Sequence, residues 1–144
     1  MESLFRVLEI SGSGLTAERL RMDVIANNIA NANTVNAQDG TPYRRKSVLL
    51  HTMQDHAFKI SLGNTLRERG VQVSGIAEDS RPPRLQYDPS HPNADEEGMV
   101  MLSNVNVLNE MVDMISATRA FEANVTAIEA TKSMAKKAIS IGNV

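Results

Sequence analysis

The densest group of side chains that could do chemistry lies between residues 87 and 98, where the chain reads YDPSHPNADEEG. One imidazole, His91, stands there among four carboxylates, a set that could bind a metal ion or carry acid–base chemistry. The spacing argues against both. A calcium loop places oxygen ligands at alternating positions around a glycine, and Pro89 and Pro92 interrupt such a loop. A zinc site needs two or three His or Cys ligands. We therefore predict a turn-rich connector.

Three other patterns match known kinds of site poorly. His51 and His56 could act as a base, but no serine lies in a Gly-x-Ser-x-Gly elbow. Residues 11–14, Ser-Gly-Ser-Gly, lack the Lys and Ser/Thr of a phosphate loop. Residues 44–46, Arg-Arg-Lys, could hold phosphate or lipid headgroups, although charges on an edge strand that faces solvent or another subunit explain them better. We predict no catalytic residue, no cofactor and no metal ligand.

A run of amides and small residues at 26–34, ANNIANANT, is more informative. Asparagine is a poor helix former because its amide competes for backbone hydrogen bonds, so a fraying helix end is one interpretation. Amides among alanines also let another helix approach closely, and a buried amide fixes register because a mispaired one stays unsatisfied. We predict a contact surface with a specified register that includes Asn28 and Asn31.

An amphipathic helix over residues 4–32 would position this run. Its apolar side chains fall at spacings of three and four, and polar Ser11 and Glu18 occupy two seam positions. Gly12 and Gly14 each cost roughly 1 kcal/mol relative to Ala, so we predict that the helix bends or restarts near Ser13. The predicted packing residues are Leu4, Leu8, Leu15, Met22, Ile25, Asn28, Ile29 and Asn31.

A second helix is predicted near the other end of the chain. No Gly or Pro lies between Asn106 and Ile141, and Gly142 stands where a helix would stop. Acidic residues near its start and lysines towards its end suit the helix dipole. The predicted packing residues of this helix are Leu108, Met111, Ile115, Phe121, Val125 and Ile128.

The segment between the helices has a different composition, since it contains all five prolines. Alternating patterns, such as Val71 with Val73 or Leu85 with Tyr87, predict short strands; residues 53–69 have no clean period and are predicted as a loop. The predicted strands cover residues 43–52, 70–78, 84–87 and 99–102.

The predicted fold is therefore mainly α with a small β-containing middle, the two terminal helices pairing in a coiled-coil-like core. We divide the chain into an N-terminal helical part of that core (1–36), a β and loop middle segment (37–103) and a C-terminal helix that completes the core (104–144). The seams are mostly aliphatic, because the 144 residues include only five aromatic side chains.

Composition excludes several kinds of function. The net charge is −2 and no segment is strongly basic, so no nucleic-acid face is predicted. Cysteine is absent, which excludes disulfides and thiol nucleophiles. The longest uncharged stretch, residues 24–38, holds five asparagines and is not expected to span a membrane. Glu2, Arg6 and Glu9 interrupt the start of the chain, so no cleaved signal peptide is expected.

With these residues in view, the chain resembles the flagellar axial proteins, and within them the subunits of the proximal rod. The axial family is indicated by Ser13-Gly14-Leu15 and by the run at 26–34. Several segments are similar to the proximal rod subunits in the same order along the chain: 42–46 (PYRRK), 87–98, 104–107, 110–115 and 119–124. The stretch from about 53 to 69 carries no matching motif.

The resemblance implies a structural subunit, not an enzyme, of the rod that crosses the periplasm and transmits torque. Its terminal helices would form the inner layer around an export channel, and it would be exported without a cleaved signal. Implied partners are other proximal rod proteins, the adaptor between rod and membrane ring, and neighbouring copies of itself.

Two other classes of function remain as alternatives. A soluble helical adaptor or export chaperone would also use amphipathic helices to bind partner helices. A peptidoglycan hydrolase would need a pair of carboxylates in a cleft, and the acidic segment 87–98 offers carboxylates without an evident cleft.

Overall fold

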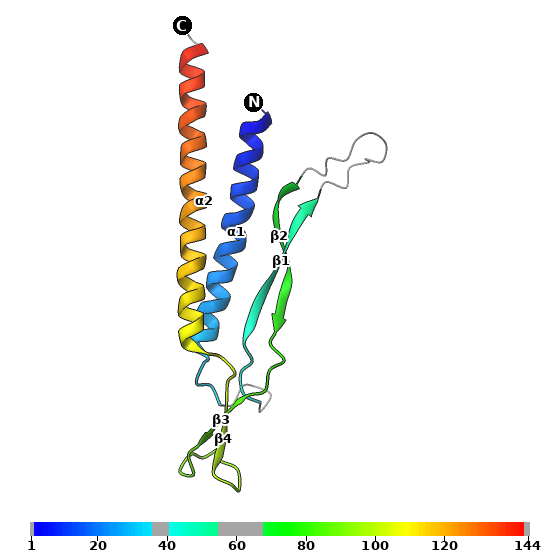
Figure 1. The fold of residues 1–144 in the computed structure, drawn as a ribbon, viewed down its shortest axis with the longest axis vertical. Helices are drawn as coiled ribbons and strands as arrows, with labels where there is room; N and C mark the ends of the chain where they lie inside the picture. The colour runs from blue at the N-terminus through cyan, green and yellow to red at the C-terminus, as the bar shows by residue number, and fades with distance from the viewer. Residues whose placement is uncertain (1, 36–40, 55–67, 143–144) are drawn as a thin grey trace, which may run out of the picture. The chain divides into compact units, whose positions relative to one another are not determined.

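The computed structural model describes residues 2–35, 41–54 and 68–142, with two long terminal helices and short strands between them (Figure 1). This confirms the predicted helical ends and β-containing middle, while pairing of the helices in a coiled-coil-like core stays a prediction. Most of the loop predicted at 53–69 lies outside the described residues. The elements are α1 (Glu2–Ala30), β1 (Lys46–Gln54), β2 (Glu68–Glu78), β3 (Arg84–Tyr87), β4 (Met99–Leu102) and α2 (Val107–Gly142).

The chain divides into two compact units, and each of them combines segments that are separated in the sequence. Unit 1 consists of Met1–Leu20, Leu49–Gly75 and Ala117–Val144, and unit 2 consists of Arg21–Val48 and Ile76–Ser116. Each helix contributes one part to each unit.

Of the two alternatives predicted near Ser13, a restart of the first helix is wrong, and a bend stays a prediction. α1 is one helix of 29 residues that runs through Gly12 and Gly14. The Ser13 hydroxyl donates to the Ile10 carbonyl at 2.7 Å and accepts from the Val71 amide at 3.1 Å, which ties the glycine-containing turn to β2. This contact with another element helps to offset the low helix propensity of the two glycines.

The second helix begins at an asparagine cap. The Asn106 side-chain oxygen accepts from the amides of Leu108 and Asn109 at 3.0 and 3.3 Å, satisfying two of the free donors of the first turn. α2 then runs for 36 residues to Gly142. The helix extends past the lysines at 132, 136 and 137, so none of them lies in its last turn.

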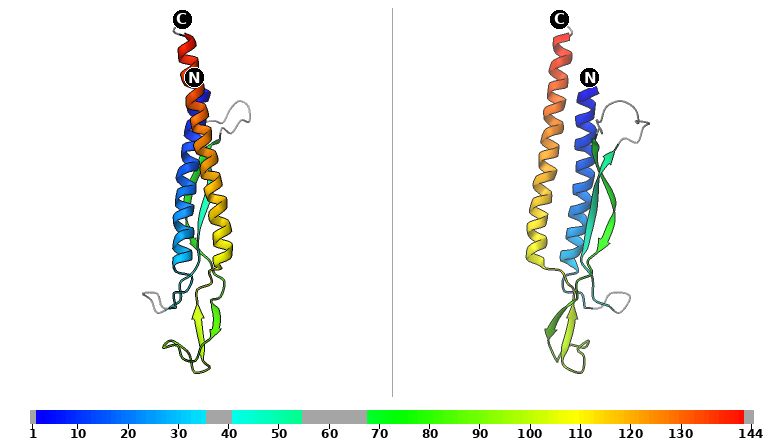
Figure 2. Two further views of the ribbon diagram at one scale, coloured as in Figure 1. Left: turned by 90° about the vertical axis from the view of Figure 1, so that its left-hand side faces the viewer. Right: turned by 45° about the vertical axis from the view of Figure 1, so that its right-hand side comes forward.

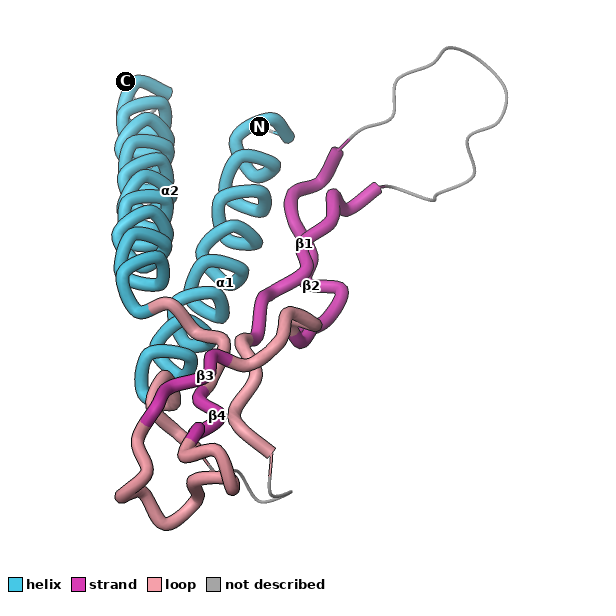
Figure 3. Tube along the Cα trace, turned by 60° about the horizontal axis from the view of Figure 1, so that its bottom comes forward, coloured by secondary structure: helices cyan, strands magenta, loops and turns pink. Residues whose placement is uncertain are grey.

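The strands form two separate two-stranded sheets, β1 with β2 and β3 with β4 (Figure 3). β1 and β2 run in opposite directions in Figure 1, and burial alternates residue by residue along the described side chains of β2, as the period of two predicted.

β3 and β4 pair antiparallel, from Arg84 opposite Leu102 to Tyr87 opposite Met99, and lie side by side in both views of Figure 2. Leu85 and Tyr87, whose alternation predicted this strand, do not form a buried face of the hairpin, since their side chains are 58% and 70% exposed. The buried side chains of this hairpin come from β4 instead.

The segment that joins β3 to β4 is the turn-rich connector that the sequence predicts. One Asp88 oxygen accepts from the Ser90 amide and hydroxyl, and one Asp95 oxygen accepts from the amides of Glu97 and Met99. Gly98 has a φ of 74°, and a Cβ there would stand 3.0 Å from the Tyr87 ring, so both conformation and space require glycine.

The buried side chains of the two units differ in kind. Those of unit 1 are small: Ser11, Ala17, Ala117 and Thr131. Those of unit 2 combine aliphatic residues with large polar ones: Val24, Ile25, Asn28, Ala32, Val100, Leu102, Ser103, Val105 and Glu110.

Candidate functional site

The asparagine run at the end of α1 leads to the most highly connected site in unit 2. Asn28 is fully buried. Its amide nitrogen donates to the Lys46 carbonyl and to Glu110 Oε2, both at 2.8 Å. Its oxygen accepts from the Lys46 amide at 2.9 Å and from the Tyr43 hydroxyl at 3.0 Å. The amide thus has two donor and two acceptor contacts, its full complement.

Glu110, in the first turn of α2, is the charged centre of the same network and is 0% exposed. Its Oε1 accepts from Arg45 Nε at 2.6 Å. Arg45 also donates to Asp113 Oδ2 at 3.1 Å, and Arg21 lies 3.9 Å from the other oxygen of that carboxylate. Two arginines therefore face two carboxylates, so the buried charge of Glu110 is compensated and both of its oxygens are hydrogen-bonded.

Asn104 connects this network to the chain before β3. Its oxygen accepts from the Arg45 amide at 2.7 Å, and its nitrogen donates to the carbonyls of Asp79 and Arg81 at 3.3 and 3.0 Å. The Asp79 amide in turn donates to the Arg45 carbonyl at 2.8 Å. The hydrogen bonds that Arg81 donates to the Asp79 carboxylate lower the pKa of that group from 3.8 to about 2.

Tyr43 closes the network on the side of the segment before β1. Burial raises the pKa of its hydroxyl, and the negative charges of Glu110 and Glu78 raise it further. The phenol is therefore protonated at neutral pH and stays a donor to Asn28.

This arrangement acts as a structural tie. A general acid or base needs a reacting position within hydrogen-bond reach, whereas Glu110 is fully buried and its oxygens are occupied by Arg45 and Asn28. The network joins three segments that are far apart in the sequence: the end of α1, residues 43–46 and the start of α2.

One prediction from the sequence needs correction here, and another stays untested. Arg45 was predicted with its neighbours as a charge on an edge strand, but its side chain reaches Glu110 and Asp113 because their carboxylates provide the compensating charge. The asparagine run was predicted to face another helix as a surface. Asn28 contacts Glu110 of α2 in its own chain, and the amide nitrogens of Asn27 and Asn31 donate back to carbonyls of α1. A contact surface of this run with another subunit stays a prediction.

Unit 1 has a different kind of contact, built on close approach. A Cβ at Gly14 of α1 would stand 3.0 Å from the side-chain nitrogen of Asn124 in α2. Gly70 in β2 has a φ of 122°, and a Cβ there would overlap the Ser13 hydroxyl oxygen. The sequence analysis did not identify Asn124 or Gly70 as contact residues. For Gly70 the reason is that a hydrophobic pattern does not indicate which glycines adopt a positive φ.

The predicted packing residues fall into three groups by exposure. Ile25 and Asn28 are buried. Those that are partly buried are Leu4, Leu8, Leu15, Met22, Ile29, Asn31, Phe121, Val125 and Ile128. Leu108, Met111 and Ile115 on α2 are 71%, 54% and 55% exposed. Which of these residues contact another subunit stays a prediction.

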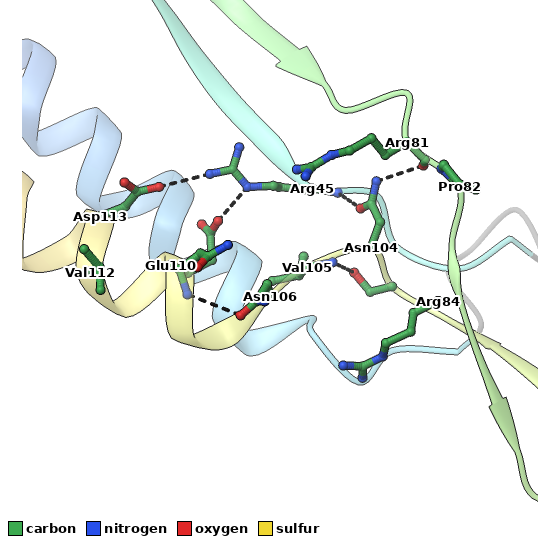
Figure 4. Close-up of a pocket in the computed structure, with 12 residues that line it drawn as sticks. Arg45, Arg81, Pro82, Arg84, Asn104, Val105, Asn106, Glu110, Val112 and Asp113 are labelled. Atoms are coloured by element: carbon green, nitrogen blue, oxygen red, sulfur yellow. Dashed lines mark hydrogen bonds and ion pairs between the residues drawn. The ribbon is translucent and has the colours of Figure 1, made fainter.

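An open pocket of about 730 Å³ lies beside the polar network in unit 2 (Figure 4). It is lined by residues from the network, from the segment leading into β3 and from the first turns of α2: Arg45, Arg81, Pro82, Arg84, Ser103, Asn104, Val105, Asn106, Asn109, Glu110, Val112 and Asp113. Among the described ranges, no group of three or more His, Cys, Asp or Glu residues is placed to hold a metal ion.

Comparison with known proteins gives matches along most of the chain. Residues 8–38 match the family described as "Flagella basal body rod protein", and residues 96–141 match "Flagellar basal body rod FlgEFG protein C-terminal". The chain is 44% identical to the flagellar basal-body rod protein FlgC of Borreliella burgdorferi, with 96% of this chain and 97% of the relative covered. It is 45% identical to that of Bacillus subtilis over the same shares, and 36% identical to that of Salmonella typhimurium over 97% and 98%.

These matches define the class as the structural rod proteins of the flagellar basal body, which are not enzymes. At this identity and coverage, the chain belongs to the FlgC family of flagellar basal-body rod proteins. Within the described ranges, neither helix combines the length and apolar character needed to cross a bilayer.

Proposed function

We propose that this chain is a structural subunit of the proximal rod, assembling helically with other rod proteins around the export channel and transmitting torque. The observation that carries the proposal is an apolar stripe on the first turns of α2, formed by Leu108, Met111, Val112 and Ile115. These side chains are 71%, 54%, 61% and 55% exposed in the single chain. A contiguous exposed apolar surface of this kind marks a protein interface.

The position of the stripe supports assembly because the same turns of α2 place a charged residue inside. Glu110 is fully buried against Arg45, while its neighbour Met111 is exposed. An ordinary surface helix has the opposite polarity. Burying the exposed part of four apolar side chains is worth roughly 1 kcal/mol each, so a neighbouring helix would stabilise the subunit by several kcal/mol.

In the assembly that we propose, residues 1–36 and 104–144 form the axial core and residues 37–103 form the middle segment outside it, with the terminal helices paired in a coiled-coil-like manner. The partners are other proximal rod proteins, the adaptor between rod and membrane ring, and further copies of this chain. The chain would lie in the part of the basal body that crosses the periplasm, and it would be exported without cleavage of a signal peptide. The mass of the protein recovered from basal bodies tests whether a signal peptide has been cleaved.

The test uses single cysteines, since the chain has none of its own. Met111→Cys and Ile115→Cys should react with a maleimide in the free chain and be protected in isolated basal bodies. Leu15→Cys, Met22→Cys and Phe121→Cys then map which packing residues crosslink to a neighbouring subunit. Ile25→Cys is the matched control because its side chain is buried within its own chain, so it should be unreactive in both states.

The second candidate, a soluble helical adaptor or export chaperone, rests on the same exposed stripe, which could bind a partner helix. It predicts a chain that stays in the cytoplasm and is absent from purified basal bodies. Full labelling of Met111→Cys and Ile115→Cys in basal bodies that do contain the chain would contradict the rod interface.

A further inference from the structure

In the part of the chain that the structure describes, the pocket of unit 2 has one cationic side chain that no neighbouring carboxylate neutralises. Arg45 is paired with two carboxylates and Arg81 with Asp79. Arg84, the first residue of β3, also lines the pocket, and its side chain is exposed. Among the described residues, the Arg84 side chain has no ion-pair or hydrogen-bond partner. Figure 4 shows Arg81 and Arg84 both directed towards the side of the pocket on which α2 lies.

The rest of the lining fits a short peptide segment that carries a carboxylate. Val112 and Pro82 give the wall exposed apolar surface, and Asn106 and Asn109 add exposed amides. A guanidinium binds a carboxylate through two parallel hydrogen bonds, and partial removal from water strengthens that pair.

The complementary charge lies elsewhere in the same unit, at the tip of the β3–β4 hairpin. Glu96 and Glu97 are exposed, and their carboxylates have no partner among the described residues. The other two carboxylates of the connector, those of Asp88 and Asp95, already accept hydrogen bonds that shape the turn. Glu97 contributes only its backbone amide to that turn.

The tip of a given chain cannot reach the pocket of that chain. Arg84 pairs with Leu102 at one end of the hairpin, and Tyr87 pairs with Met99 at the other. The tip therefore begins three residues, about 10 Å, beyond Arg84 along a hydrogen-bonded ladder. Folding back would break this ladder, so the carboxylate must come from another chain.

We propose that Glu96 and Glu97 of one copy bind the Arg84 pocket of the next copy of the same chain. The two patches differ, so the contact is heterologous, the type that generates rings or open helical arrays. The inference rests on the proposed rod function, because it supplies a contact between copies in that assembly. Charge complementarity within one chain favours a second copy over a different rod protein.

The experiment forms a crosslink across this contact while leaving its charges native. Asn109→Cys lines the pocket and Asn93→Cys lies beside the tip; both positions are exposed. Cells that lack the native gene express the two single-cysteine chains together, and their basal bodies are isolated and treated with a short bis-maleimide. A crosslinked dimer of the two chains is the expected result.

Charge reversal then tests the pairing. Arg84→Glu in the Asn109→Cys chain, or Glu96→Arg with Glu97→Arg in the Asn93→Cys chain, should each lower the dimer yield about fivefold, and combining them should restore it. Arg44→Glu is the matched control, since Arg44 is an exposed arginine outside the pocket lining, and it should leave the yield unchanged.

Each other outcome overturns the proposal in a recognisable way. No dimer, although both chains are present in basal bodies, contradicts this contact and leaves the rod function intact. A crosslink to a protein of different mass identifies another rod protein as the occupant. Equal loss of yield with Arg44→Glu shows a general effect of charge. Absence of the unreversed cysteine chains from basal bodies counts against the proposed function itself.

Discussion

Unit 1 and unit 2 are stabilised internally by different kinds of contact, although each unit contains parts of the same two helices. In unit 2, the contact between α1 and α2 is made by a buried amide and a buried carboxylate, Asn28 and Glu110, whose hydrogen-bonding groups are satisfied. In unit 1, the helices meet where Gly14 faces Asn124, and β2 meets α1 where Gly70 faces Ser13. Unit 2 therefore depends on specific hydrogen-bonding partners, and unit 1 depends on glycines that leave room for a neighbouring side chain.

The same difference is seen along one face of α2, at four positions spaced seven residues apart: Glu110 in unit 2, and Ala117, Asn124 and Thr131 in unit 1. Glu110 and Ala117 are fully buried and Thr131 is 3% exposed. A partner-dependent contact loses stability when a polar group is removed, because other buried groups are left unpaired. A space-dependent contact loses stability when a methyl group is added. The two kinds of substitution therefore distinguish the units.

The largest effect is expected from Glu110→Ala, which leaves Arg45 and the Asn28 amide without their buried acceptor. We expect a loss of about 3–5 kcal/mol in the free energy of unfolding, the range for breaking a buried ion pair. Urea unfolding followed by far-UV circular dichroism measures the loss. Amide hydrogen exchange should show that the amides of unit 2 lose protection before those of unit 1.

Two controls accompany this substitution. Glu110→Gln keeps an acceptor of similar shape and should cost less than Glu110→Ala. Asp113→Ala removes a carboxylate that is 39% exposed and should cost least of the three. A change below about 1 kcal/mol for Glu110→Ala would show that water replaces the network at little cost, and the contrast between the units would fail.

Gly70→Ala should have the next largest effect, now in unit 1. The φ of 122° disfavours any side chain, and the added Cβ would overlap the Ser13 hydroxyl, so we expect a loss of about 1–3 kcal/mol in unfolding free energy. Gly75→Ala, in the same strand, is the matched control because a Cβ there meets nothing within 4 Å. Equal effects at the two glycines would remove the evidence for a close contact at Ser13.

The elements themselves could be predicted because their signals are local. The long stretch without Gly or Pro gives α2 its extent, and β3 (Arg84–Tyr87) and β4 (Met99–Leu102) lie at the predicted residues. The continuity of α1 could not be predicted in the same way. The Ser13 contact with Val71 that supports its glycine-containing turn joins residues 58 positions apart in the sequence.

The residues buried within the single chain are not the ones that a hydrophobic stripe selects, for a physical reason. A hydrophobic stripe selects Leu8, Leu15 and Met22, which are only partly buried, whereas Ser11, Ala17 and Asn28 are buried. The buried positions of α1 hold small residues (Ser11, Ala17), aliphatic residues (Val24, Ile25) and the paired polar Asn28, so hydrophobicity alone does not identify them. The ion pairs of Arg45 could not be predicted, because only the fold brings the carboxylates of Glu110 and Asp113 close to it.

A paired substitution in α1 isolates close approach from helix propensity. Gly12→Ala should stabilise the chain by about 0.5–1 kcal/mol, because a Cβ at Gly12 meets nothing within 4 Å and Ala is the better helix former. Gly14→Ala gains the same propensity but presses on Asn124, whose nitrogen donates to the Ala120 carbonyl at 3.0 Å. We expect it to be less stable than Gly12→Ala by about 0.5–1 kcal/mol in thermal or urea unfolding. Equal stabilisation at both positions would show that Asn124 moves aside freely.

The smallest effect is expected at the exposed margin of unit 2, where Arg81 holds the pKa of Asp79 at about 2 instead of 3.8. A lowered pKa in the folded state means that this carboxylate stabilises the fold above its ordinary pKa and that the contribution is lost as the pH falls towards about 2. Asp79→Asn should therefore remove a small part of the acid sensitivity of unfolding while leaving the backbone bonds of residue 79 to Arg45 and Asn104 in place. Salt should reduce the difference, because the Arg81 side chain is 66% exposed to solvent while Asp79 is 18% exposed. Acid titrations of both proteins at low and high salt provide the measurement. An effect as large as that of Glu110→Ala would mean that the exposed pair, not the buried carboxylate, holds this part of the unit together.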